Sequence, residues 1–365
     1  MRFELERVSL RFRGPPPVDA LADVTLSIDT GERLALMGSS GSGKSSLLRV
    51  LAGLEAPSDG RVLRDGADIT ALEPPARDVA MVLQDAPLYG HLSLRDNAAH
   101  PLRMRGVRAA DARRVSDGML ERVGLSARAA AKASEVSGGE RRRAALARAL
   151  VWKPALLLLD EPFASLDPAS RLSLRDLVRE LCTEMNCACV HATHDGLEAL
   201  ALGTTLAVLD RGRLVDHGSP SRLWSSPACE ASSQLLGDVP MNLVSLAGAN
   251  GDSRRVGLRP EHVRVAASDG AAAGAARARS PSASIDGAAW SADGRIVGID
   301  SLGDRSLLSI RLGDGSLVRA IVAASAPSAT TDAARSAAHH EGDSVSLSAA
   351  AESLVEFHHA AEART

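Results

Sequence analysis

A run of glycines and serines ends in a Lys-Ser pair at Gly38-Ser39-Ser40-Gly41-Ser42-Gly43-Lys44-Ser45. Glycines let consecutive backbone N–H groups turn inward around phosphate oxygens, and a helix that begins after such a loop points its positive end at the anion. In this spacing the Lys44 ammonium reaches the β and γ phosphates, and the Ser45 hydroxyl is a Mg²⁺ ligand. The loop, together with Ser46 beside it, therefore predicts a site for a nucleoside triphosphate and Mg²⁺.

Two carboxylates follow the run Leu156 to Leu159, which is typical of a buried strand. Asp160 and Glu161 then lie at the carboxyl end of that strand, where ligands bind in open α/β sheets. We expect Asp160 to hold Mg²⁺ and Glu161 to orient or deprotonate an attacking water. Without the phosphate loop, a solvated turn after the strand would explain the pair equally well.

A second anion site is indicated by Ser137-Gly138-Gly139, which opens a helical pattern that runs to Leu150. The N-terminus of a helix presents free N–H groups to an anion. Taken alone, this short motif is more typical of a helix cap.

The elements that must position these residues alternate between strand and helix. Residues 1–36 are expected to be strands, residues 45–54 a helix, and residues 92–150 mostly helical. Leu172 to Leu181 has the periodicity of an amphipathic helix, and Cys189 to Ala192 is expected to be a strand. This alternation predicts an α/β fold with a parallel sheet.

The composition changes after Gly237. Residues 238–365 are rich in Ala, Ser and Gly and carry short β-like runs, which predict a small all-β domain. The runs are Val256 to Leu258, Val263 to Val265, Ile296 to Ile299, Leu307 to Leu312, Leu317 to Val322 and Val345 to Leu347. The stretch at about 266–289 is of low complexity and is expected to be an insert. We therefore predict a first domain over 1–237 and a second over 238–365.

Composition limits the classes of function. The chain has 42 basic and 45 acidic side chains and a net charge of −3, so no global basic field is available for nucleic acid. Aromatic residues make up 2% of the chain, which argues against base-stacking platforms. The 4 cysteines lack metal-ligand spacing and are typical of buried thiols in a reducing compartment. No stretch approaches the ~18 apolar residues of a membrane span, so work at a membrane would be peripheral.

With these residues in place, the sequence resembles the ATP-binding cassette (ABC) ATPases, specifically the nucleotide-binding subunits of bacterial importers. The resemblance covers residues 1 to about 237. The phosphate loop matches the Walker A motif, Ser137-Gly138-Gly139 matches the signature, and Asp160-Glu161 matches the Walker B motif with the catalytic glutamate. Further matches follow only from the resemblance: Phe12 with the aromatic that stacks on adenine, Gln84 with the glutamine that senses Mg²⁺ and water, Asp167 in the D-loop Ser165-Leu166-Asp167, and the catalytic switch histidine at His194.

The resemblance implies a P-loop NTPase cassette with a RecA-like core and a helical subdomain at about residues 86–149. It implies an ATPase that powers solute import, with ATP and Mg²⁺ held between the Walker A loop of one cassette and the signature of a second. The expected partners are another cassette, as a homodimer, and membrane permease subunits, with a solute-binding protein acting indirectly and no nucleic acid. The implied location is the cytoplasmic face of the inner membrane, in an importer of the sugar, sulfate, iron or polyamine type.

The second domain carries a resemblance of its own. Arg259-Pro260-Glu261-His262 resembles an element of the OB-like (TOBE) regulatory domain of importer ATPases, and Met241-Asn242-Leu243-Val244 resembles the segment that opens it. The resemblance implies a small all-β OB-like domain, which exporters rarely carry. An exporter ATPase and a non-transport ABC protein remain the alternatives to import.

The sequence departs from the family's pattern at three places. Glu140 replaces the usual signature glutamine, Val136 replaces a leucine, and Gly203-Thr204-Thr205 stands where an Asp-Arg pair is common. None of these changes removes a predicted catalytic group.

Overall fold

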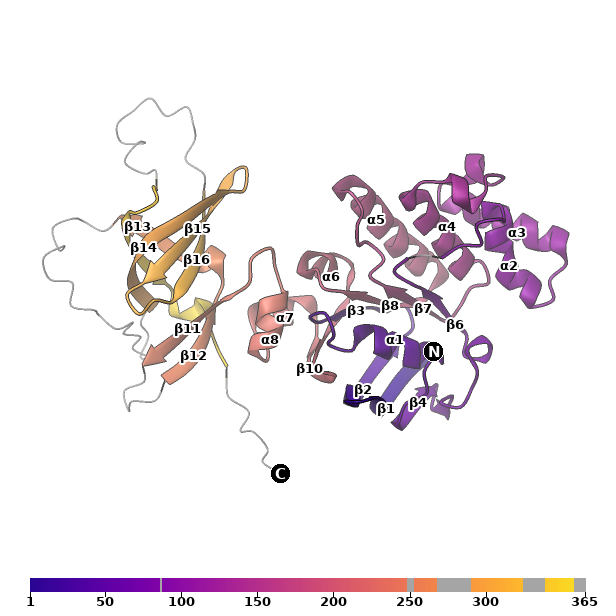
Figure 1. Cartoon of the computed structure of the whole chain (residues 1–365), viewed down its shortest axis with the longest axis horizontal. Coiled ribbons are helices and arrows are strands. Elements are labelled where there is room, and N and C mark those ends of the chain that lie inside the picture. The colour runs from indigo at the N-terminus through magenta and orange to yellow at the C-terminus, as the bar shows by residue number, and fades with distance from the viewer. Residues whose placement is uncertain (86, 248–252, 268–289, 324–338, 358–365) are drawn as a thin grey trace, which may run out of the picture. The chain divides into compact units, whose positions relative to one another are not determined.

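A computed structural model describes residues 1–85, 87–247, 253–267, 290–323 and 339–357. The chain divides into two compact units, Met1–Leu223 and Trp224–Thr365, which we describe separately. Figure 1 labels most of their helices and strands. Residues 224–237 fall in the second unit of this division, so a domain boundary at 237 stays a prediction from composition.

The first unit alternates strands and helices along most of its length. Its strands are β1 (Arg2–Phe12), β2 (Val18–Asp29), β3 (Arg33–Met37), β4 (Asp59–Arg64), β5 (Ala67–Asp68), β6 (Val79–Val82), β7 (Leu156–Asp160), β8 (Ala188–Thr193), β9 (Thr205–Asp210) and β10 (Arg213–Gly218). Its helices are α1 (Lys44–Ala52), α2 (Leu94–Met104), α3 (Ala109–Arg122), α4 (Gly138–Leu150), α5 (Pro168–Met185) and α6 (Gly196–Leu202). Helix α7 (Pro220–Ser225) spans the division between the units. The predicted α/β fold is confirmed.

A six-stranded sheet forms the centre of the first unit, in the order β10-β9-β3-β8-β7-β6. Its strands pair in parallel except for β10, which is antiparallel to β9. Every residue of β7 and β8 is buried, which accounts for their nearly continuous apolar sequences. Successive strand residues face opposite sides, so Leu156 and Leu158 join one core and Leu157 and Leu159 join the other.

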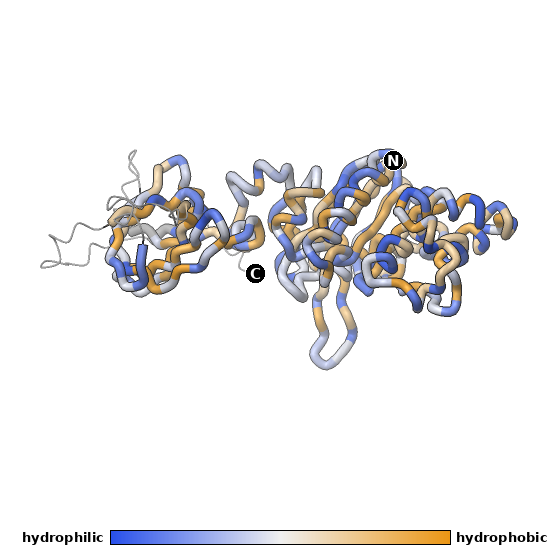
Figure 2. The backbone as a smooth tube through the Cα atoms, turned by 90° about the horizontal axis from the view of Figure 1, so that it is seen from above, coloured by the Kyte–Doolittle hydropathy of each residue, from blue (hydrophilic) through white to orange (hydrophobic). Residues whose placement is uncertain are grey.

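The two faces of this sheet are covered by different layers (Figure 1). On one face, helix α1 lies between the central sheet and an antiparallel sheet of order β2-β1-β4-β5, and its leucines share a core with Phe3 and Leu5 of β1. On the other face, α2, α3, α4 and α5 build a second core. Figure 2 shows apolar stretches along the strands between these layers. Helices α2 to α4 form the predicted helical subdomain, with α4 ending at Leu150.

The second unit is all-antiparallel β structure apart from α8 (Glu230–Leu235) and short 3-10 turns. Its strands are β11 (Asn242–Ala247), β12 (Ser253–Leu258), β13 (Arg264–Ala267), β14 (Trp290–Ser301), β15 (Arg305–Leu312), β16 (Leu317–Ala323), β17 (Ser344–Ala349) and β18 (Leu354–Glu356). They form sheets of order β11-β12-β18 and β13-β17-β14-β15-β16 around one core that contains the buried Trp290. The predicted β runs are confirmed, and most of the low-complexity stretch 266–289 lies outside the described residues.

Asn242 ties the two sheets of the second unit together. Its side-chain amide donates to the Arg319 carbonyl at 2.8 Å and its amide oxygen accepts from the Arg319 N–H at 2.7 Å. Strands β11 and β16 are thereby joined across the two sheets. This curled, all-antiparallel arrangement confirms the predicted OB-like class of the domain.

Arg259, in the Arg-Pro-Glu-His element, holds the start of the second unit. Its Nε and Nη2 donate to the Trp224 carbonyl at 3.2 and 2.8 Å, and its Nη1 donates to the Leu236 carbonyl at 3.0 Å. Its guanidinium carbon lies 3.6 Å from the centre of the Trp224 ring, and only 3% of the residue is exposed. The element that resembled a family motif is thus a structural clamp on residues 224–236.

Removing this clamp should weaken the second unit. Arg259→Met keeps an apolar stem but leaves the Trp224 and Leu236 carbonyls without their donors, so we expect the free energy of unfolding of this unit to fall by about 2 kcal/mol or more. Urea unfolding followed by tryptophan fluorescence measures the change. The control is Arg264→Met on β13, an exposed arginine expected to cost under about 0.5 kcal/mol. Equal losses in the two variants would contradict the assignment.

Candidate functional site

The predicted site residues follow four strands that are neighbours in the central sheet. The phosphate loop follows β3, His194 follows β8, Asp160 and Glu161 end β7, and Gln84 follows β6. Because β3, β8, β7 and β6 are parallel and adjacent, their carboxyl ends meet at one edge of the sheet. The topology therefore brings together groups that are far apart in the sequence.

In the phosphate loop, the backbone conformation at Gly43, directly before Lys44, is one that only glycine allows. Gly43 caps α1 with a φ of +106°, and a Cβ there would lie 2.5 Å from the Ala20 carbonyl oxygen. Gly41 also has a positive φ, +78°, but a Cβ there would meet no atom within 4 Å. The Ser42 hydroxyl is buried and has no hydrogen-bond partner in the described part of the chain. The loop thus curls tightly at Gly43 and leaves an unused polar group inside it.

Lys44 turns back into this loop. Its Nζ donates to the carbonyls of Gly38 at 2.7 Å and Ser39 at 3.0 Å, and the residue is buried. Burial lowers the pKa of Lys44, while the charges of Glu161 and Asp160 act in the opposite direction. The ammonium group is therefore held in the loop, close to the two carboxylates that end β7.

Ser45 and Asp160 meet directly. The Ser45 hydroxyl donates to Asp160 Oδ1 at 3.0 Å, which joins the first turn of α1 to the end of β7. Asp160 is 8% exposed, so this carboxylate faces the protein interior at the sheet edge. A hydroxyl and a carboxylate at this spacing are oxygen donors of the kind that Mg²⁺ prefers.

Glu161 and His194 form the next contact along the edge. His194 Nδ1 lies 3.2 Å from Glu161 Oε1, and the imidazole is largely exposed. The Glu161 N–H donates to the Ala192 carbonyl of β8 at 3.1 Å, and Glu161 adopts a φ of +45°. This backbone turn aims the carboxylate away from the buried strand and toward the histidine.

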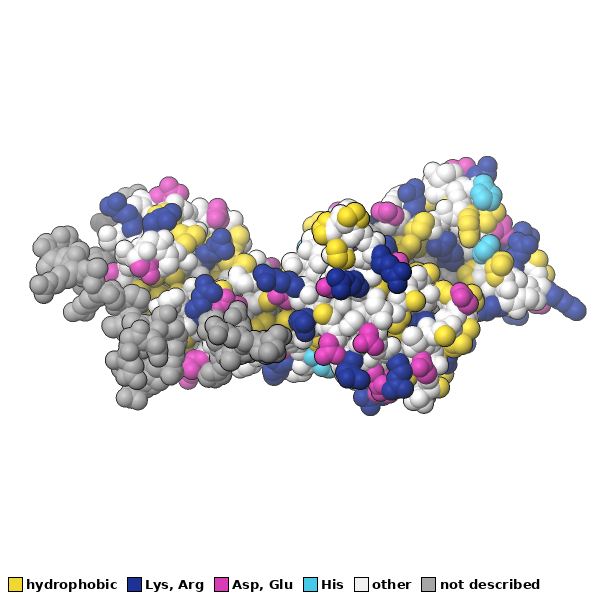
Figure 3. Space-filling view, turned by 60° about the horizontal axis from the view of Figure 1, so that its bottom comes forward, with side chains coloured by type: hydrophobic (Ala, Val, Ile, Leu, Met, Phe, Trp, Pro, Cys, Tyr) yellow, Lys and Arg dark blue, Asp and Glu magenta, His cyan; other side chains and the backbone are white. Residues whose placement is uncertain are grey.

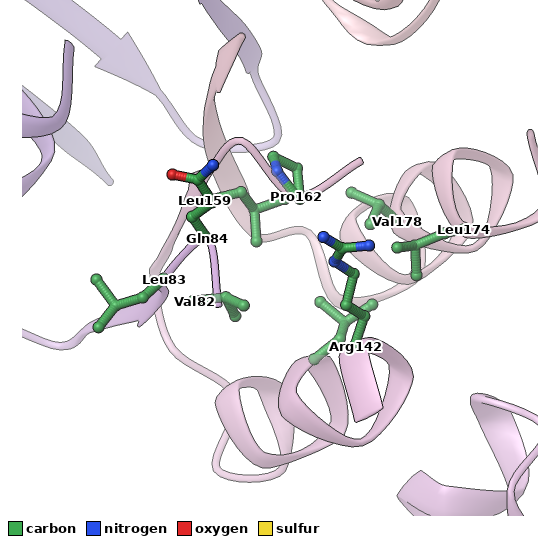
Figure 4. A pocket seen from close by; sticks show the side chains of 9 residues that line it. Val82, Leu83, Gln84, Arg142, Leu159, Pro162, Leu174 and Val178 are labelled. Atoms are coloured by element: carbon green, nitrogen blue, oxygen red, sulfur yellow. The ribbon is translucent and has the colours of Figure 1, made fainter. Parts of the chain in front are cut away.

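A cavity of about 340 Å³ adjoins this pair, and Gln84 lies in its wall together with Glu161 and His194. Gln84 is exposed in the loop after β6. Gln84 also borders a second, narrow gap, which Figure 4 shows. There Arg142 of α4 reaches toward Leu174 and Val178 of α5. The three predicted catalytic residues thus border one polar space.

The signature residues cap a helix. Ser137 Oγ accepts from the Glu140 N–H at 3.2 Å, and Glu140 Oε2 accepts from the Ser137 N–H at 2.9 Å, which is a complete capping box. These hydrogen bonds lower the pKa of Glu140. A Cβ built on Gly138 or Gly139 would meet no atom within 4 Å, so the helix start has open space around it. This geometry is compatible with both predicted roles of Ser137-Gly138-Gly139, a helix cap and an open anion site.

Two other predicted residues lie at the margins. Asp167 is exposed and caps α5 by accepting from the Ser170 N–H at 3.0 Å, and the hydrogen bonds from Ser170 lower its pKa. Phe12 ends β1 opposite Val18 of β2 and is 38% exposed. Strand β2 passes the phosphate loop at Ala20, beside Gly43. Stacking of Phe12 on adenine stays a prediction.

Sequence reasoning assigned no role to several residues that line the same cavity, among them Arg171 of α5, Thr193 at the end of β8, and Glu198 of α6. The Thr193 hydroxyl donates to Glu198 Oε2 at 2.8 Å, and Arg171 Nε lies 3.5 Å from Glu198 Oε1. The His194–Glu198 spacing of four residues, at the start of a helix, was the available signal. Arg171 carries no local signal, because its carboxylate partners, Asp195 and Glu198, are far away in the sequence.

A separate groove of about 760 Å³ lies between β6, the residues after Gln84 and the ends of α2 and α4. The exposed side chains of Tyr89 and Met104 lie in it, and the Arg105 guanidinium carbon is 3.7 Å from the centre of the Trp152 ring. Burial lowers the pKa of Arg148, which also lines the groove. The described residues that line it include arginines but no carboxylate. Figure 3 shows histidine, arginine and apolar side chains gathered on one part of the first unit.

Comparison with known families matches both units. The model of the family described as "ABC transporter" matches residues 21–164, and the model described as "TOBE domain" matches residues 256–357. The described residues contain no helix with the length and apolar character that a membrane crossing requires.

Several curated proteins are similar over about two thirds of the chain. A "Fe(3+) ions import ATP-binding protein" of Agrobacterium fabrum is 40% identical over 248 residues, which is 67% of this chain and 70% of the relative. A "Sulfate/thiosulfate import ATP-binding protein" of Nocardia farcinica is 42% identical, with 67% and 71% covered. An "sn-glycerol-3-phosphate import ATP-binding protein" of Chromohalobacter salexigens is 35% identical, with 72% and 76% covered.

A solved structure is similar to the first part of the chain. It is the dimeric, post-hydrolysis state of an ATP-binding cassette bound to ADP and Pi, at 28% identity and a TM-score of 0.56. The match covers 60% of this chain and 98% of that cassette.

Two of the three phosphate-loop glycines, Gly41 and Gly43, should differ in their tolerance of alanine. Gly41→Ala meets only the cost of a positive φ, about 1 kcal/mol, because open space surrounds the position. Gly43→Ala adds an overlap with the Ala20 carbonyl, so we expect a loss of about 3 kcal/mol or more in the free energy of unfolding. Urea unfolding of the two variants measures the difference. Equal losses would show that the loop around Gly43 relaxes freely.

Proposed function

The chain belongs to the ABC transporter family, and within it to the import ATP-binding proteins, and on this premise we propose that it hydrolyses ATP to power import of a solute. The observation that carries the proposal is the pairing of groups at one sheet edge. Ser45 contacts Asp160, and Glu161 contacts His194, at the ends of adjacent strands. The TOBE match favours an importer over an exporter.

The nucleotide phosphates would lie in the loop Gly38–Gly43. Backbone N–H groups of the loop and the start of α1 face an anion at that position. The buried Ser42 hydroxyl, which lacks a partner in the described residues, is a further donor for a phosphate oxygen. Lys44, now bound to its own loop carbonyls, would exchange them for the β and γ phosphates.

The residues at the sheet edge fit Mg²⁺. Ser45 and Asp160 supply a hydroxyl and a carboxylate oxygen 3.0 Å apart, and the Gln84 amide oxygen would supply a third donor. No cluster of three His, Cys, Asp or Glu able to hold a metal exists among the described residues, so the phosphates would complete the ligand set. When bound, Mg²⁺ neutralises charge on the phosphates.

Hydrolysis would use Glu161 as the base. Its carboxylate borders the cavity and would accept a proton from the attacking water. His194, hydrogen-bonded to Glu161, would fix the orientation of that carboxylate. Gln84 lines the same cavity and would place the water.

One cassette does not complete this site in our proposal. The open start of α4 at Ser137-Gly138-Gly139 would meet the γ phosphate held by a second cassette, and Asp167 would lie at the same junction. The similar solved cassette is a dimer. Phe12 would stack on adenine.

The groove beside Gln84 would receive a permease subunit. Its lining is apolar, with Arg105 and Arg148 and no carboxylate among the described lining residues. We propose that its occupant is an amphipathic helix of the permease that carries an acidic side chain. Residues 87–89 line this groove and follow Gln84 closely in the sequence, so docking there would act next to the catalytic cavity. The chain would then lie on the cytoplasmic face of the inner membrane, and a solute-binding protein would act through the permease.

Glu161→Gln tests the proposed chemistry. The amide keeps the shape of the side chain but cannot accept a proton, so hydrolysis should fall by ~10²-fold or more and an ATP-bound dimer should accumulate. Phosphate release and light scattering measure the two effects. Turnover by Glu161→Gln near the wild-type rate would exclude Glu161 as the base.

Adding Ser137→Asp to Glu161→Gln should abolish the ATP-bound dimer, because Asp keeps the helix cap and places a carboxylate against the partner's γ phosphate.

The matched control in the Glu161→Gln background is Ser126→Asp. Ser126 is an exposed serine of the same helical region that, in the described residues, makes no hydrogen bond to the start of α4. We expect ATP-induced dimerisation to persist in this control and ATP to bind the monomer in all variants. A dimer that survives Ser137→Asp would contradict the composite site without contradicting ATP hydrolysis.

Arg105→Glu tests the docking groove. Placing a carboxylate beside Trp152 should repel the acidic helix and reduce co-purification of the co-expressed permease subunits by about tenfold or more. Arg103→Glu changes another exposed arginine, in the last turn of α2, that does not line the groove. Equal co-purification of the permease with both variants would contradict this groove as the docking site.

A further inference from the structure

Arg171 contacts both loops that carry the catalytic pair. It lies in the first turns of α5, and its Nη2 donates to the Leu166 carbonyl at 3.4 Å. Its Nη1 lies 3.5 Å from Asp195 Oδ2, and its Nε lies 3.5 Å from Glu198 Oε1. Leu166 belongs to the loop after Glu161, whereas Asp195 and Glu198 follow His194. One guanidinium group therefore spans the two segments.

The segment around His194 is held on both sides. The Thr193 hydroxyl donates to Glu198 Oε2 at 2.8 Å and accepts from the Asp195 N–H at 3.0 Å. Asp195 Oδ1 accepts from the N–H groups of Leu197 at 2.9 Å and Glu198 at 3.1 Å, which caps α6. The residues directly before and after His194 are thus fixed to the start of α6, and Glu198 links them to Arg171.

The segment around Glu161 is fixed to the sheet at one end only. The Glu161 N–H bonds to Ala192 of β8, and the Ala164 N–H bonds to the Glu161 carbonyl at 3.3 Å. Glu161 and Ser165 both have positive φ angles, +45° and +59°, so the turn holds two strained backbone positions. The bond from Arg171 to Leu166 restrains the far end of this turn.

Burial makes the charges of this group costly to leave unpaired. Glu198 is 8% exposed, and burial raises its pKa while the Thr193 hydroxyl and Arg171 act in the opposite direction. Arg171 Nε is also buried and makes an ion pair, but no hydrogen bond, in the described residues. A carboxylate this buried is costly to leave without a partner, and Arg171, whose side chain is 39% exposed, supplies the positive charge that offsets this cost.

We propose that Arg171 and Glu198 are positioning residues that brace the Glu161 loop against the His194 loop, so that the 3.2 Å contact between Glu161 and His194 is kept during turnover. This inference rests on the proposed ATPase function. Both residues line the 340 Å³ cavity beside the catalytic pair without touching the phosphate loop in any hydrogen bond or ion pair of the described residues. Their loss should therefore change the rate of hydrolysis and not the affinity for ATP.

The experiment compares Arg171→Met, Glu198→Gln and the double variant with wild type. We expect each single variant to lower kcat by ~10-fold or more, because a misplacement of about 1 Å can cost 10²-fold, while KM stays within about twofold. The double variant also removes the buried Glu198 carboxylate that Arg171→Met leaves without its guanidinium partner. We expect its kcat to stay as low as in the worse single variant, since the two residues act as one unit.

Arg175→Met is the matched control. Arg175 lies one turn further along α5, is also half-buried, and pairs with Asp176 of its own helix. We expect its kcat to equal that of wild type. All rates are measured at a temperature where circular dichroism shows each variant folded, with ATP affinity taken from calorimetry.

Three outcomes would overturn the brace. The first is a wild-type kcat in Arg171→Met, and the second is a kcat that recovers in the double variant. The third is a double variant whose fold-loss in kcat equals the product of the two single losses. Recovery would mean that the pair only neutralises buried charge, and multiplication would mean that the two residues act independently. Absence of ATP hydrolysis by the wild-type chain would instead contradict the proposed function, so the two failures are distinguishable.

Discussion

The adjacency of four parallel strands, β3, β8, β7 and β6, is the constraint on which the rest of the site depends. Each strand ends at the same edge, so each following loop starts within reach of its neighbours. The hydrogen bond from Ser45 to Asp160 and the contact of His194 with Glu161 are consequences of this order. Two cores, one on each face, hold the strands in register, and the continuous burial of β7 fixes the position where its carboxylates emerge.

The sequence allowed prediction of those parts of the site whose chemistry is local. The phosphate loop needs glycines, a lysine and a hydroxyl at fixed spacing, and the α/β fold follows from strands that alternate with helices. The link between Arg171 and Glu198 could not be predicted in this way, because it joins side chains of α5 and α6 whose distance is set by the packing of both helices on the sheet. The boundary near residue 237 was read from composition, whereas Arg259 binds Trp224 and Leu236 through contacts that composition does not reveal.

Glu140 shows how a departure from a family pattern can preserve a structure. Its carboxylate accepts from the Ser137 N–H, and Arg128 lies 3.3 Å from its other oxygen. A glutamine has an oxygen at the same place, so the capping box does not distinguish the two residues. The added negative charge lies at the positive end of α4, which is electrostatically favourable. That end is also where an anion would have to bind, and Arg128 offsets part of the repulsion that the carboxylate would exert on it.

The brace also has a mechanical rationale. A loop that must release product cannot be rigid along its whole length, yet a general base loses its effect when its position varies by a fraction of an ångström. Restraint at the ends of each loop meets both demands. Thr193 and Asp195 flank His194, and Leu166 lies beyond the turn that starts at Glu161, so the restraints hold the chain on either side of the Glu161–His194 contact and do not bond to those two side chains themselves. Helix α5 can support Arg171 because it begins where the loop after Glu161 ends. It is also joined to α6 by the hydrogen bond that Arg179 donates to the Ala201 carbonyl.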